Sequence, residues 1–147
     1  MTASTHSEVV KCSVDTLWAF FENKGEWATL IPGYLHHELK SEQEMIWVFE
    51  GDFGIIKKPV KVSLQVKSVE PQQKFAFSLE GLSDNINGGG YFEVGQQGDA
   101  TTIIGHLDLK AGGFLAAMIN PVLENYIPKT TTELVKAMAQ HIEVTTV

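Results

Sequence analysis

A chain of 147 residues is long enough for one domain with a substantial core, and we expect residues 1–147 to form a single domain. Its contents of 44% hydrophobic and 20% charged residues are globular values, which exclude a disordered or fibrous chain. The formal net charge of -7 argues against a nucleic-acid partner, because phosphate binding needs clustered Lys and Arg.

We expect neither a secretory signal nor a membrane-spanning segment in this sequence. The first ten residues lack the charged and apolar blocks of a signal peptide, and Cys12 is the only cysteine, so no intramolecular disulfide can form. No stretch approaches the roughly 18 consecutive apolar residues that a spanning helix needs. We therefore expect a cytoplasmic protein without a transmembrane segment, for which a transient contact with a membrane surface stays open.

The first third of the chain predicts one strand and two short helices. Residues 6–12 have a strand pattern, and Ser13 follows as a candidate N-cap. Val14, Leu17, Trp18 and Phe21 then fall on one helical face. Residues 26–30 can form a second helix, which Pro32 and Gly33 end.

Residues 35–110 alternate between apolar and polar side chains, a period typical of strands with one face on a core. Turn residues divide this region into six strands, and the run from Asn87 to Gly90 is interpreted as one of the turns. Together with residues 6–12, the pattern predicts a sheet of about seven strands. The predicted inward set includes Trp47, Phe49, Val60, Val62, Leu64, Phe75, Phe77, Phe92, Ile103, Leu107 and Leu109.

The last segment, residues 113–143, predicts one long helix with a broad apolar stripe. Asn120 is a candidate N-cap for Pro121, and Pro128 predicts a bend near residues 124–128. A stripe this wide needs an apolar surface to cover. A curved antiparallel sheet wrapped around such a helix tends to leave an interior pocket.

Few polar groups fall on the inward face. His37 is in phase with Leu35 and Leu39, which makes it the best candidate for a polar group inside the pocket. Gly51, Gly90 and Gly105 also fall inward, where they either widen the pocket or let the sheet bend.

The sequence offers no metal site and no convincing catalytic set. His36 and His37 point to opposite faces of a strand, and no other ligand falls at a suitable spacing. Glu50 and Asp52 are two residues apart, but strand parity places them on a solvated face. We therefore expect no metal, no cofactor and no catalytic residues.

The order of elements resembles the START-like helix-grip superfamily, also called SRPBCC, which includes polyketide cyclases and lipid-transfer domains. Residues 14–18 (VDTLW), 27–33 (WATLIPG) and 112–116 (GGFLA) look like the branch named for the G subunit of carbon monoxide dehydrogenase. The resemblance implies an α+β helix-grip fold, in which a curved antiparallel sheet surrounds the C-terminal helix and two short helices follow the first strand. It also implies a deep cavity for an apolar molecule.

These observations predict a protein that binds or transports a hydrophobic small molecule, lipid-, quinone- or polyketide-like, without catalysis. Two alternatives stay open: a cyclase, dehydratase or hydrolase that uses His37 as acid or base with Tyr126 orienting the substrate, and an accessory factor that associates with a molybdenum-containing redox enzyme through an exposed apolar patch. The expected ligand-binding residues are His37, Trp47, Phe49, Phe75, Phe77, Phe92, Leu107, Leu115, Met118, Ile119, Val122 and Tyr126.

Overall fold

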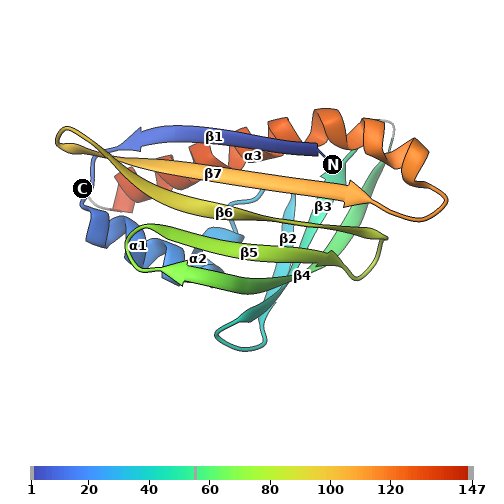
Figure 1. Cartoon of the computed structure of the whole chain (residues 1–147), viewed down its shortest axis with the longest axis horizontal. Helices are drawn as coiled ribbons and strands as arrows, with labels where there is room; N and C mark the ends of the chain where they lie inside the picture. The colour runs from blue at the N-terminus through green and yellow to red at the C-terminus, as the bar shows by residue number, and fades with distance from the viewer. Residues whose placement is uncertain (1, 55, 146–147) are drawn as a thin grey trace.

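The computed structural model describes residues 2–54 and 56–145, which form a sheet, two short helices and one long helix (Figure 1). In chain order the elements are β1 (Thr2–Val10), α1 (Val14–Glu22), α2 (Lys24–Ala28), β2 (Tyr34–Leu39), β3 (Glu44–Asp52), β4 (Lys57–Glu70), β5 (Lys74–Gly81), β6 (Ile86–Gln97), β7 (Ala100–Ala111) and α3 (Ala116–Thr145).

The seven strands form one antiparallel sheet in the order β1-β7-β6-β5-β4-β3-β2. In Figure 1, β2 and β3 run at a steep angle to β5, β6 and β7, as in a strongly curled sheet, and α3 runs along β1 and β7, against which it packs. This is the predicted α+β helix-grip fold, and the prediction is confirmed. Within the described residues, no helix is long and apolar enough to cross a membrane.

The N-terminal helices are held by a side-chain cap and an indole hydrogen bond. Ser13 caps α1, since its Oγ accepts from the backbone N of Thr16 at 3.1 Å. The indole Nε1 of Trp27 on α2 donates to the carbonyl of Phe21 at 2.9 Å. The two helices are therefore fixed to each other at their junction.

Aromatic side chains fill the concave face of the sheet beneath α1 and α2. Trp27 lies with its ring centroid 5.0 Å from that of Phe92 and 5.5 Å from that of Trp47, whose Nε1 donates to the carbonyl of Ala28 at 2.9 Å. Phe75 and Phe77 complete this cluster, and all of these side chains are buried. This end of the interior is solid.

The glycine-rich run is part of a strand, which corrects its interpretation as a turn. Gly88 and Gly90 lie within β6, where a Cβ would stand 2.1 Å from the Asp108 carbonyl oxygen and 2.3 Å from that of His106. Side chains cannot fit where the neighbouring backbone approaches so closely. Glycine is therefore a packing requirement here.

The inward glycines do not widen the interior. A Cβ at Gly105 would lie 2.4 Å from Cγ2 of Val135 on α3, and one at Gly51 would lie 2.6 Å from Cζ of Phe53. The volume that these glycines leave is already occupied by a neighbouring side chain. They bring α3 and the Phe53 ring close to the sheet.

Candidate functional site

A cavity of about 500 Å³ lies between the sheet and the first turns of α3. It occupies the part of the interior that the aromatic cluster does not fill. Its walls come from β3, β4, β7, the loop before β4, the β5–β6 turn and α3, and nearly all of its lining side chains are apolar. The lining consists of Phe49, Phe53, Ile56, Lys58, Val60, Asp84, Asn85, Ile86, Leu109, Ala111, Gly112, Gly113, Phe114, Leu115, Met118, Ile119, Val122, Leu123 and Tyr126.

One ion pair stands at the edge of this cavity. Lys58 at the start of β4 bonds to Asp84 in the β5–β6 turn, and Ser83 Oγ donates to the same carboxylate at 2.8 Å. Burial raises the pKa of Asp84, but the hydrogen bonds from Lys58 and Ser83 and the lysine charge outweigh it and hold the pKa below its ordinary value. The pair connects two segments of the cavity wall.

A second, more polar hollow of about 690 Å³ adjoins the cavity along α3. Phe53, Val122 and Tyr126 line both spaces, so they form the boundary between them. The centroids of the Phe53 and Tyr126 rings are 5.0 Å apart. Five charged side chains line the second hollow, those of Glu50, Asp52, Lys57, Lys129 and Glu133, whereas the first cavity has only the paired Lys58 and Asp84 among its lining residues.

Tyr126 carries a buried hydroxyl at this boundary. Among the residues that the structure describes, its Oη has no hydrogen-bond partner. Burial raises the pKa of Tyr126, and the carboxylates of Asp52 and Glu133 raise it further. The Thr130 hydroxyl acts in the opposite direction on this pKa, but its geometry does not amount to a hydrogen bond. The phenol is therefore a neutral donor without an acceptor.

The structure divides the expected ligand-binding residues other than His37 into two groups. Phe49, Leu115, Met118, Ile119, Val122 and Tyr126 line the cavity. Trp47, Phe75, Phe77, Phe92 and Leu107 do not line it, because they are packed in the solid part of the core. Strand parity identifies the inward face but does not tell the filled end of the interior from the open end.

His37 lies outside both hollows. Its Nδ1 is 2.7 Å from Oη of Tyr34, and its Nε2 faces α2, 3.2 Å from where a Cβ of Gly25 would stand. A register shift between Tyr34 and His36 interrupts the strand parity, and Leu35 and Leu39 are exposed. The structure therefore does not bring His37 and Tyr126 into one site.

Several lining residues escaped the sequence analysis because they lie in loops. Ile56, Asp84 and Asn85 belong to connections in which side-chain direction follows no period. Loop position alone gives no signal of a pocket. Only the closure of the sheet around α3 brings these residues together.

Exposed apolar side chains surround the entrance. Phe114, Met118 and Ile56 are 95%, 69% and 55% exposed, and all three also line the cavity. The apolar surface of the interior therefore continues to the outside of the molecule at this end.

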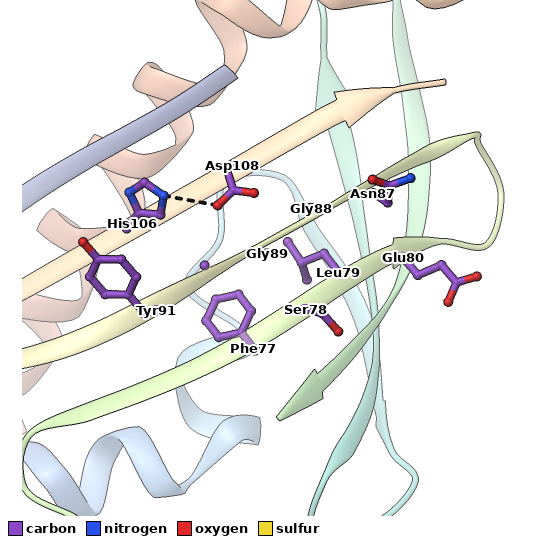
Figure 2. A pocket seen from close by; sticks show the side chains of 11 residues that line it. Phe77, Ser78, Leu79, Glu80, Asn87, Gly88, Gly89, Tyr91, His106 and Asp108 are labelled. Atoms are coloured by element: carbon purple, nitrogen blue, oxygen red, sulfur yellow. Dashed lines mark hydrogen bonds and ion pairs between the residues drawn. The ribbon is translucent and has the colours of Figure 1, made fainter. Parts of the chain in front are cut away.

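A separate depression of about 690 Å³ lies on the outer face of β5, β6 and β7 (Figure 2). There His106 Nε2 lies 3.2 Å from Asp108 Oδ2, and His106 Nδ1 lies 2.8 Å from Oγ1 of Thr5. The ring of Tyr91 stacks on His106 with centroids 4.8 Å apart. These contacts within β7 and to β1 and β6 hold the imidazole on the outer surface, away from the interior cavity.

Metal ligands do not gather anywhere in residues 2–54 and 56–145. No group of three or more His, Cys, Asp or Glu side chains lies close enough there to hold a metal ion.

A curled antiparallel sheet that grips a C-terminal helix, with a hollow between them, defines the START-like helix-grip class of proteins. The chain belongs to the CoxG family, named for the G subunit of carbon monoxide dehydrogenase, whose family model matches residues 7–143. No protein of curated function matches the sequence significantly.

Solved structures with the same fold cover nearly the whole chain. A START superfamily protein from Mycobacterium smegmatis is 14% identical over 99% of both chains, with a TM-score of 0.76. A conserved protein from Geobacillus kaustophilus is 18% identical over 97% of this chain and 96% of its own, with a TM-score of 0.72. The Zhui aromatase/cyclase from Streptomyces sp. R1128 is 11% identical over 99% of this chain and 95% of its own, with a TM-score of 0.71. At these identities the likeness concerns the fold alone.

Proposed function

We propose that this protein binds a hydrophobic small molecule, lipid-, quinone- or polyketide-like, in the cavity beside α3, and carries or senses it without transforming it. The observation that supports this most is the apolar lining of a hollow of about 500 Å³. Ligand pockets of roughly 300–1,000 Å³ hold small organic molecules, and an apolar lining favours an apolar guest over water.

The packing of the molecule also supports this role. Protein interiors are normally filled to high density, as the aromatic end of this one is. An unfilled apolar cavity forfeits the dispersion contacts that a guest would restore. Family membership and the shared fold of an aromatase/cyclase and a START superfamily protein are consistent with a small-molecule role.

Fluorescence of N-phenyl-1-naphthylamine, a neutral apolar probe, tests the proposal. Ile119→Trp places an indole in the cavity, and Lys136→Trp places one at an exposed position of the same helix as a control. We expect the wild type and Lys136→Trp to enhance the probe signal and Ile119→Trp to lose the enhancement while keeping its circular dichroism spectrum. Equal enhancement by Ile119→Trp, or none by the wild type, would contradict the proposal.

Service to a molybdenum-containing dehydrogenase is a second candidate. The family description names carbon monoxide dehydrogenase, and the exposed side chains of Phe114 and Met118 offer an apolar contact surface. Affinity purification from the source cells tests it. A dehydrogenase that copurifies with the wild type but not with Phe114→Ser would support this role, and its absence from both would count against it.

The cyclase-type alternative has no such support. It requires His37 and Tyr126 to contact the same substrate, whereas His37 is hydrogen-bonded to Tyr34 and lines neither hollow. The expected cytoplasmic location belongs to the proposal as well, and fractionation of the source cells checks it.

A further inference from the structure

We infer that the ligand of this cavity is a neutral amphiphile whose uncharged oxygen, such as a ketone carbonyl, accepts a hydrogen bond from Oη of Tyr126, and whose polar end reaches the adjoining charged hollow. This inference rests on the proposed function and adds the chemical class of the ligand to it.

The first support is the hydroxyl itself. Oη of Tyr126 is buried, and none of the described residues gives it a hydrogen-bond partner. Buried polar groups are nearly always paired, because leaving one unpaired costs the full loss of its hydration. Oη has almost no surface open to either hollow, so a ligand oxygen would supply the missing acceptor when the phenol turns toward it.

The second support is the position of Tyr126. Its side chain lines the apolar cavity and also the polar hollow, so it stands where the character of the surroundings changes. The Phe53 ring, which folds back over Gly51, lies beside it at the same boundary. A molecule that extends past these two rings would keep its apolar body on one side and its polar end on the other.

The third support is the sign of the nearby charge. Asp52 on β3 and Glu133 on α3 are the charged groups that act on the phenol, and both disfavour further negative charge there. Glu50 adds a third carboxylate to the hollow, against the two ammonium groups of Lys57 and Lys129. A carboxylate ligand would meet repulsion at Tyr126, whereas a neutral acceptor would not.

Competition with N-phenyl-1-naphthylamine by decane, decan-2-one and decanoate at pH 8 tests the inference. The variant Tyr126→Phe removes only the hydroxyl, and Tyr34→Phe removes a hydroxyl that faces His37 outside the cavity. We expect Tyr126→Phe to weaken decan-2-one binding by about fivefold to tenfold, as for the loss of one hydrogen bond, and to leave decane within about twofold. Tyr34→Phe should leave both probes unchanged.

The charge argument is tested with Asp52→Asn. This substitution should strengthen decanoate binding and leave decan-2-one binding within about twofold, because only the anion is repelled by the carboxylate that the substitution removes.

The outcomes distinguish a failure of this inference from a failure of the proposed function on which it rests. If none of the probes binds the wild type, both the proposed function and the inference are overturned. If decane binds but Tyr126→Phe weakens the ketone no more than the alkane, only the hydrogen bond is overturned. If decanoate binds the wild type tightly and Asp52→Asn does not strengthen its binding, the neutral class of ligand is overturned.

Discussion

The side-chain amide of Asn120 hydrogen-bonds with both backbone groups of Ala111. The backbone N of Ala111 donates to Oδ1 at 2.8 Å, and Nδ2 donates to the Ala111 carbonyl at 3.2 Å. Ala111 is the last residue of β7, and Asn120 lies in the second turn of α3, not at the N-cap that the sequence suggested. One side chain therefore fixes where the helix leaves the sheet, next to the cavity.

Replacing Asn120 tests how much its hydrogen bonds to Ala111 stabilise the connection between β7 and α3. Ala111 is 2% exposed, so Asn120→Ala leaves two buried backbone groups unpaired, and we expect a loss of about 1–3 kcal/mol in the free energy of unfolding. Asn120→Asp can still accept but not donate and should fall in between. Urea denaturation measures both, with the exposed Asn125→Ala as control, which should stay within about 0.5 kcal/mol. If Asn120→Ala leaves the free energy of unfolding unchanged, the two hydrogen bonds to Ala111 do not stabilise the protein.

Gly105 and Val135 should behave as a coupled pair. A methyl group at Gly105 would stand 2.4 Å from Cγ2 of Val135, so Gly105→Ala should destabilise the protein by about 1–3 kcal/mol through overpacking. Val135→Ala removes the clashing atom. In urea denaturation we expect the double variant to lose clearly less stability than the sum of the losses of the two single variants. Simple additivity would show that α3 does not pack here as described.

Asp84 should contribute stability that disappears in acid. The pKa of its carboxyl is held below the ordinary value of 3.8, so the contribution is complete above about pH 4 and is lost as the pH falls through the lower folded-state pKa. The pair with Lys58 is partly exposed, so the free energies of unfolding of the wild type and Asp84→Asn should differ by no more than about 1 kcal/mol. Thermal melts of the two proteins across acidic pH measure it. A difference that persists unchanged at the lowest pH would contradict the assignment.

Tyr126 should ionise later than an ordinary tyrosine. Its folded-state pKa is raised above 10.0, so the tyrosinate absorbance that Tyr126→Phe removes should develop only at higher pH. Because the unfolded chain releases this proton first, the free energy of unfolding should fall as the pH rises past about 10, and Tyr126→Phe should lack that component. Alkaline titration of both proteins checks this. If the transition that Tyr126→Phe removes lies within the ordinary tyrosine range, the phenol is not buried as described.

The sequence predicted the fold because its strands and helices carry clear periods. Alternation along Val60, Val62 and Leu64 and the broad apolar stripe of α3 suffice to place a sheet on a helix. The glycine run in β6 was misread because a close backbone approach and a turn use the same residue.

The site was less predictable, because the alternation along a strand tells which face a side chain lies on but not whether that side chain lines a cavity. Trp47 and Phe49 have the same parity on β3, yet Trp47 is covered by Trp27 and the carbonyl of Ala28, while Phe49 borders open space. Which of them lines a cavity depends on where α1 and α2 end and on the loop that carries Phe53. Those placements follow from tertiary contacts, which no local pattern encodes.

A crystal structure of the protein grown with 1-bromodecane tests the binding account most directly, because the bromine locates the molecule by its anomalous signal. We expect the bromine and its chain between Phe49, Leu109 and Ile119, in the hollow beside the start of α3. Bromine found only on the outer surface, with the side chains of α3 collapsed into that hollow, would contradict the account.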